Sequence, residues 1–265
     1  MIPLVAGEIP DKGPLKYKPL SMRRYVRQFY CRKVQQAPHK TGCLMSLYAE
    51  FLKNEDRPIH KMAHYFVAYE RHFGRFAGRP CTFLEIGAGN GGSSQMWKRW
   101  FGPLARIVTI DINPICKQFE DEQVAVRIGD QSDGVFLQSL LDEFGPFDAV
   151  LDDGSHQMEH VTKSFNYLYD RISPNGVYIV ESMHTAYWPE WGGGLRDGRS
   201  FIEHFKMLLD ELNAYHIKNN ELPPTTFTNT TFCMSAYDSI LVFEKAAFIN
   251  RNTFMIGDES KRVNY

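Results

Sequence analysis

The stretch Leu84-Glu85-Ile86-Gly87-Ala88-Gly89-Asn90-Gly91-Gly92 decides the fold. It starts as an apolar β run and ends in glycines, which permit a tight turn and close backbone approach before the next helix. Such loops bind ligands beyond the carboxyl ends of parallel strands. Gly87, Gly89 and Gly92 also fit the pattern GxGxxG, so a nicotinamide cofactor has to be considered, and the loop alone does not decide.

Around this stretch, short β runs alternate with helical segments. The β runs cover residues 82–87, 106–111, 124–129, 147–153 and 176–181, and the helices between them cover residues 93–101, 115–122, 134–144 and 159–172. This alternation requires parallel pairing through right-handed crossovers. A helix at 200–216 follows, and then two runs at 230–236 and 239–246 that resemble an antiparallel pair. We therefore expect an α/β, Rossmann-like, mostly parallel seven-stranded sheet with helices on both faces.

The chain before the sheet has a different composition. Residues 57–80 predict a helix that ends near Gly78 and Pro80, and residues 46–54 are helix-like. From Lys12 to Lys40 there are nine Lys or Arg and no Asp or Glu. A solvated or inter-subunit face and an anion-binding segment both explain that stretch. We expect three parts: a basic N-terminal extension at 1–56, a catalytic domain at 57–248 and a tail at 249–265.

Composition excludes several classes of protein. The 265 residues are 43% hydrophobic and 23% charged, with a formal net charge of −1, which argues against general nucleic-acid binding. No apolar run approaches the ~20 residues of a membrane span. We expect no signal peptide at the N-terminus. The five cysteines are scattered and never spaced CxxC, so we expect a cytoplasmic protein without disulfide scaffold or zinc cluster.

Acidic residues at the first three strand ends bear on the cofactor. Glu85 lies in the approach to the glycine loop, where it suits the cationic amino-acid end of S-adenosylmethionine (SAM) and repels a pyrophosphate. Asp111 closes the second strand, where a carboxylate holds ribose hydroxyls. Asp130 and Gln131 follow the third strand and suit an adenine edge and its amine. With the loop residues Gly87, Gly89 and Asn90, this set favours SAM over NAD.

Reactive side chains follow the next two strands. The fourth β run ends in Asp152-Asp153-Gly154-Ser155-His156, and the fifth ends in Glu181-Ser182-Met183-His184-Thr185. Because adjacent parallel strand ends face one crevice, carboxylates and imidazoles converge there, and their charge has to be balanced. A hard divalent cation, with Asp153, Glu181 and the Ser182 hydroxyl as oxygen ligands, would balance it.

The histidines of this cluster have separate expected roles. His156 is placed to take a proton from an attacking hydroxyl, and we expect it to be catalytic together with Asp153. His184 either contacts substrate or orients its loop. Asp152 is expected among the cofactor-binding residues, where it braces the turn rather than binds metal, and His160 belongs to the surface or to a supporting layer.

An aromatic segment follows the fifth strand. Tyr187, Trp188 and Trp191 stand beside three consecutive glycines, Gly192 to Gly194. Aromatic faces suit sugar rings or planar polyketides, so we interpret the segment as a lid over the substrate. The alternative is a loop packed at a subunit contact.

Together, these segments resemble the bacterial sugar O-methyltransferases of the macrolide and rhamnosyl type, a family of class I SAM-dependent methyltransferases related to cephalosporin hydroxylases. The matching stretches include FLEIGAGNGGSSQMW, VTIDINP, RIGDQSD, FDAVLDDGSH and GVYIVESMHTAYWPEWGGG, and they lie in family order over residues 60–214.

The resemblance implies site residues of its own. The family's magnesium ligands correspond to Asp153 and to the pair Glu181-Ser182, and its catalytic base corresponds to His156. Tyr65, with Tyr69 or His64, matches the segment that covers SAM, and the N-terminal region matches one used for oligomer contacts. Family members carry Glu-Asp where this chain has Glu181-Ser182. This departure leaves open a weakened metal site, a neutral ligand, or a metal-free site.

We therefore expect a SAM-dependent O-methyltransferase, magnesium-assisted with His156 as base, that forms homo-oligomers. Its acceptor would be a natural-product deoxysugar, as in antibiotic biosynthesis, a nucleotide sugar or a surface polysaccharide. The alternatives are a hydroxylase of the cephalosporin type and a non-catalytic SAM-binding subunit. An RNA methyltransferase is disfavoured because no RNA-binding module accompanies the basic segment.

Overall fold

The computed structural model describes residues 46–257 and Val263. The chain divides into two units, residues 1–43 and 44–265, and only the second contains described residues. The basic segment from Lys12 to Lys40 and part of the tail therefore lie outside the described residues. Residues 246–257 form no helix or strand. No helix in the described part of the chain has the length and apolarity that crossing a membrane requires.

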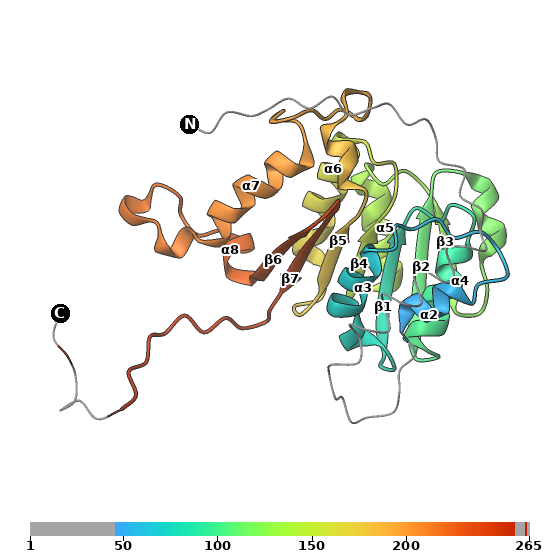
Figure 1. The fold of residues 1–265 in the computed structure, drawn as a ribbon, viewed down its shortest axis with the longest axis horizontal. Helices are drawn as coiled ribbons and strands as arrows, with labels where there is room; N and C mark the ends of the chain where they lie inside the picture. Colours follow the sequence, from blue (N-terminus) through green and yellow to red (C-terminus); the bar gives the residue numbers. More distant parts are fainter. Residues whose placement is uncertain (1–45, 258–262, 264–265) are drawn as a thin grey trace, which may run out of the picture. The chain divides into compact units, whose positions relative to one another are not determined.

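One seven-stranded sheet organises this unit, in the order β3-β2-β1-β4-β5-β7-β6 (Figure 1). The first five strands pair in parallel, and β7 runs antiparallel to both of its neighbours. This confirms the predicted mostly parallel sheet with a closing antiparallel pair. The strands are β1 (Cys81–Ile86), β2 (Ala105–Asp111), β3 (Val124–Ile128), β4 (Ala149–Asp152), β5 (Val177–Val180), β6 (Thr231–Tyr237) and β7 (Ile240–Lys245).

Helices cover both faces because residues along β1 alternate between them. Phe83 packs on Phe73 and Trp97, which lie in α3 and α4. Leu84 belongs to the core on the other face, which α5, α6 and α7 supply. The helices are α2 (Leu47–Leu52), α3 (Tyr65–Phe73), α4 (Gly92–Phe101), α5 (Gly134–Phe144), α6 (Met158–Leu168), α7 (Phe201–Leu212) and α8 (Thr226–Thr230).

Helix α2 packs against the sheet unit, although the sequence assigned it to the extension. The Tyr48 N–H donates to the Glu70 carboxylate at 3.1 Å, and the Tyr48 ring meets Phe66 edge-on with centroids 5.1 Å apart. The contacts with the sheet unit therefore begin before residue 57.

Two predicted helices are wrong in extent or type. The helix expected over 57–80 begins only at Tyr65, and residues 57–62 have no regular secondary structure. Gly92 explains this path, because a Cβ there would lie 2.4 Å from the carbonyl oxygen of Arg57, so the segment passes directly over the start of α4. The crossover expected over 115–122 is a 3₁₀ helix, η2 (Pro114–Phe119).

Candidate active site

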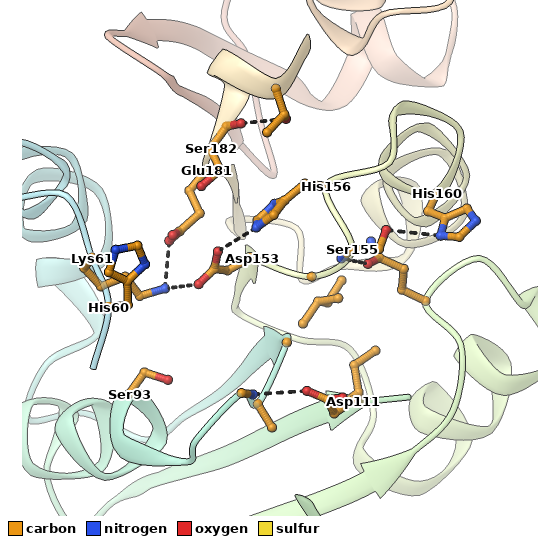
Figure 2. A pocket seen from close by; sticks show the side chains of 18 of the residues that line it. His60, Lys61, Ser93, Asp111, Asp153, Ser155, His156, His160, Glu181 and Ser182 are labelled. Carbon is orange, nitrogen blue, oxygen red and sulfur yellow. Dashed lines mark hydrogen bonds and ion pairs between the residues drawn. The ribbon is translucent and has the colours of Figure 1, made fainter. Parts of the chain in front are cut away.

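One pocket of about 590 Å³ lies beyond the carboxyl ends of the parallel strands (Figure 2). We call its two parts the glycine side, formed by the loops after β1, β2 and β3, and the lysine side, formed by residues 57–62 and the loops after β4 and β5. Most predicted site residues line it: Tyr65, Gly87, Gly89, Asn90, Asp111, Asp130, Gln131, Asp153, His156, Glu181, Ser182, His184, Trp188 and Trp191.

Backbone packing shapes the glycine loop. Gly87 has φ +99°, and a Cβ there would lie 2.2 Å from the carbonyl oxygen of Asp153. A side chain at Gly87 is therefore excluded both by conformation and by space. The backbones of the loops after β1 and β4 are in close contact at this point, and this contact joins the two sides of the pocket.

Asp111 and Asp130 organise the rest of the glycine side. Asp111 accepts hydrogen bonds from the backbone N–H of Gly89 at 3.1 Å and of Asn113 at 2.9 Å. It thus ties the loop after β2 to the glycine loop while facing the pocket. Asp130 accepts from the backbone N–H of Ser132 at 2.7 Å, and this hydrogen bond lowers the pKa of Asp130. Backbone N–H groups thus fix both carboxylates in place.

Gln131 connects the pocket to a buried network. Its amide donates to Asp152 at 3.1 Å, and its carbonyl oxygen accepts from the backbone N–H of Ser155 at 2.7 Å. Asp152 also accepts from the hydroxyl of Ser164 at 2.8 Å. Burial raises the pKa of Asp152 to about 6. These hydrogen bonds therefore hold the loop after β3 against the loop after β4.

Two predicted cofactor-binding residues do not line the pocket, which corrects the sequence interpretation. Glu85 is fully buried, and its oxygens accept from Ser94 and from the Trp97 indole, each at 3.0 Å. Asp152 is 1% exposed. A strand-end position places a side chain in the crevice or beneath it according to the pleat and local twist, which the sequence does not reveal. Glu85 therefore gives no argument against a pyrophosphate.

The lysine side is centred on an ion cluster that the sequence analysis missed. The Lys61 ammonium donates to the carboxylates of Asp153 and Glu181, the latter at 2.9 Å (Figure 2). The Tyr69 hydroxyl also donates to Glu181. Burial alone would lower the pKa of Lys61, but the charges of Asp153 and Glu181 raise it well above its usual value, so the ammonium stays protonated. Burial raises the pKa of Glu181.

His156 lies on the other side of Asp153 from Lys61 (Figure 2). Its Nε2 is 3.6 Å from Asp153 Oδ1, and its ring centroid lies 5.9 Å from that of Trp191. The residue has φ +56°, a left-handed backbone conformation that is uncommon outside glycine. Burial lowers the pKa of His156, so its imidazole is neutral at pH 7.

His184 takes part in a hydrogen-bonded chain. Its Nδ1 lies 2.7 Å from the Ser239 hydroxyl, to which the Tyr65 hydroxyl donates at 2.8 Å. The Tyr65 oxygen in turn accepts from the Ser182 N–H at 3.1 Å. These contacts join α3, the loop after β5 and the β6–β7 turn. His184 therefore has an orienting contact as well as a place in the pocket wall.

The aromatic segment after β5 divides between pocket and surface. Trp188 lines the pocket, and its ring meets His184 edge-on at 5.0 Å. Tyr187 is 48% exposed and is not part of the lining, so its expected substrate contact stays a prediction. The segment forms two short 3₁₀ helices, η4 (Met183–Tyr187) and η5 (Pro189–Trp191), in which side chains three residues apart share a face, and Thr185, Trp188 and Trp191 all line the pocket.

Other lining residues were also missed or set aside. His60 belongs to the segment misread as helix, Ser93 lies in the first turn of α4, and His160 Nδ1 lies 3.1 Å from the Ser155 hydroxyl. Ser93 lies in a motif stretch but was given no role, and His60 and His160 belong to no motif, so only a position near a predicted loop could have suggested them.

The pocket and sheet order can be compared with known proteins. No protein-family model matches the chain. It is 40% identical over 175 residues to 8-demethyl-8-alpha-L-rhamnosyl tetracenomycin-C 2'-O-methyltransferase of Streptomyces olivaceus, covering 63% of this chain and 46% of that protein. It is 34% identical over 199 residues to demethylmacrocin O-methyltransferase of Streptomyces fradiae, covering 71% and 49%. The chain spans about half the length of these curated relatives.

Solved structures give the same relationship. MycE methyltransferase from the mycinamycin pathway, in complex with Mg and SAH, superposes with a TM-score of 0.68 at 28% identity, over 86% of this chain and 60% of that one. MycE with Mg, SAH and mycinamycin VI gives a TM-score of 0.66 at 26% identity, over 91% and 66%.

The sheet order, the glycine loop and the pocket beyond it define the class I methyltransferase fold. Within that class, the chain is homologous to the sugar O-methyltransferases of macrolide and tetracenomycin pathways. The resemblance inferred from the sequence motifs is thereby confirmed.

Proposed function

We propose that this chain transfers a methyl group from SAM to a hydroxyl on a sugar ring of a glycosylated natural product. The observation that carries the proposal is one continuous pocket in which the glycine loop faces Asp153 and His156. Relatives named for rhamnosyl tetracenomycin and demethylmacrocin support a glycoside acceptor over a nucleotide sugar or a polysaccharide.

The glycine side suits the cofactor. Gly87 and Gly89 line the pocket without side chains, which lets an adenosyl group approach the backbone, and the Asp111 carboxylate would accept hydrogen bonds from the ribose hydroxyls. Asp130 and Gln131 would contact the adenine. SAM, when bound, supplies an electrophilic methyl group.

The lysine side suits the proton transfer. His156 is neutral at pH 7 and can accept the hydroxyl proton as the sugar oxygen attacks the methyl group. The Asp153 carboxylate, 3.6 Å from Nε2, would stabilise the imidazolium that forms. Trp188 and Trp191 would pack against the acceptor. Because the methyl donor is already activated, positioning of the two reactants supplies much of the rate.

Transfer of a labelled methyl group from SAM to a panel of rhamnosylated polyketides, macrolide glycosides and nucleotide sugars tests this proposal. We expect transfer to a glycoside, and we expect His156→Ala to reduce the rate by about 10²–10⁴-fold while SAM affinity stays within about twofold. His204→Ala is the matched control, since His204 is a partly buried histidine bonded to Asn166 outside the pocket lining. SAM binding without transfer to any acceptor would instead favour a non-catalytic subunit.

A cytoplasmic location and a homo-oligomeric state remain part of the proposal. Both derive from the sequence, and the N-terminal region expected to make subunit contacts lies largely outside the described residues.

A further inference from the structure

Two acidic side chains converge in the lysine side of the pocket. Asp153 follows β4 and Glu181 follows β5, and the Glu181 side chain is only 2% exposed. Burying two carboxylates close together costs free energy unless a positive charge lies near them. The sequence alone called for a divalent cation in that role.

Lys61 already occupies the place between these carboxylates. Its ammonium donates to Asp153 Oδ2 and, at 2.9 Å, to Glu181 Oε2, and its side chain is 2% exposed. The second Glu181 contact comes from the Tyr69 hydroxyl. Figure 2 shows the ammonium at the point where the two acidic side chains meet. One protein cation thus bonds both acidic side chains and offsets part of the charge that would otherwise recruit an ion.

The position of Lys61 is built into the fold. The segment that carries it passes over Gly92, where a Cβ would lie 2.4 Å from the Arg57 carbonyl oxygen and 2.6 Å from that of Pro58. The Asn54 side chain donates to the same Arg57 carbonyl at 2.8 Å. Packing and a hydrogen bond therefore hold the backbone just before Lys61 in place, and this places the ammonium between the two carboxylates.

The neighbouring side chains add no third carboxylate to this site. Ser182, which follows Glu181, offers only a neutral hydroxyl in place of a third carboxylate. Among the described residues, no group of three or more His, Cys, Asp or Glu side chains could hold a metal ion. The donor set thus supplies two carboxylates, both already bonded to an ammonium.

We propose that the Lys61 ammonium replaces a divalent cation in this chain, so that its site binds no magnesium. Lys61 then acts as a positioning residue: it holds Asp153 through Oδ2, while Oδ1 faces His156. Its part in methyl transfer rests on the proposed function, but the exclusion of metal does not.

Uptake of Mn²⁺, followed by electron paramagnetic resonance of the free ion, tests the exclusion without any acceptor. Mn²⁺ shares the preference of Mg²⁺ for octahedral oxygen ligands. We expect no uptake by the native chain, and a gain of about one Mn²⁺ per chain in Lys61→Ala, with a further gain in affinity in Lys61→Ala/Ser182→Asp, because both changes expose or add oxygen ligands. Lys61→Arg should keep the charge and take up none.

Lys98→Ala is the matched control, because Lys98 pairs with Asp121 at 2.9 Å on the surface, away from the pocket. It should gain no Mn²⁺. Uptake by the native chain that Asp153→Asn abolishes would overturn the proposal. Absence of uptake in a folded Lys61→Ala chain would also overturn it, because the two carboxylates would then not be a cation site that the lysine has filled.

A second measurement needs only the native chain, in case Lys61→Ala does not fold. A lysine-selective NMR spectrum should show an ammonium signal for Lys61, assigned with Lys61→Arg, that exchanges slowly with water and persists in excess MgCl₂. Loss of that signal on adding magnesium would overturn the proposal. Failure of the proposed function would appear separately, as an absence of SAM binding or methyl transfer with these metal results unchanged.

Discussion

The two sides of the pocket are built in different ways. The glycine side consists of backbone and of carboxylates bonded to nearby backbone N–H groups, as in Asp111 with Asn113 and Asp130 with Ser132. The lysine side consists of side chains brought from distant parts of the chain: Lys61 is 92 residues from Asp153 and 120 from Glu181. A cofactor surface can thus be set by local turns, whereas the reactive cluster depends on tertiary packing.

Gly87→Ala should give the largest effect, because the two sides touch at that residue. A Cβ there meets a backbone oxygen in a left-handed conformation, so we expect a loss of about 2–4 kcal/mol in the free energy of unfolding. Gly145→Ala, at φ +77° with open space around it, should cost about 1 kcal/mol. Urea denaturation measures both. Equal losses of unfolding free energy in the two variants would mean that the Asp153 backbone does not resist a side chain at position 87.

Trp188→Ala should have a smaller effect, confined to the lysine side. Losing an aromatic wall of the pocket should raise the acceptor KM about tenfold while SAM affinity is unchanged. Tyr187→Ala is the matched control, because this neighbour is exposed to a similar extent but does not line the pocket. It should change KM by less than about twofold. Steady-state kinetics decides, and similar KM values for both variants would argue against the assignment of the pocket wall.

The smallest effect concerns pH. Burial lowers the pKa of His156 below its ordinary value of 6.5, and a general base has to be neutral to act. The rate should therefore be at its full value at pH 7 and fall only as the pH drops through a midpoint below 6.5. The pH dependence of kcat/KM reports this midpoint. A midpoint at or above 6.5 would contradict the assignment of His156 as the base.

The contrast between the two sides also explains what the sequence could predict. The strands and the glycine loop were predictable because each has a local pattern, and the structure confirms the sheet. Asp153, His156 and Glu181 line the pocket as expected because strand ends meet there.

The errors have physical causes that no local pattern carries. Residues 57–64 are predicted as the start of a helix, yet contact with Gly92 and the carboxylates holds part of the segment over the pocket. Glu85 looked exposed at a strand end, yet Ser94 and Trp97 bury it. Lys61 belongs to no sequence motif, and its role depends on Asp153 and Glu181, which only the tertiary structure brings near it.

Calorimetric titration with SAM, with NAD as the competitor and Asp111→Asn as the matched variant, tests the central claim most directly. The account predicts that the native chain binds SAM and not NAD, and that Asp111→Asn weakens SAM binding by about tenfold, because a carboxylate facing the ribose is lost. Binding of NAD in place of SAM, or no binding of SAM at all, would contradict the assignment of this pocket to methyl transfer.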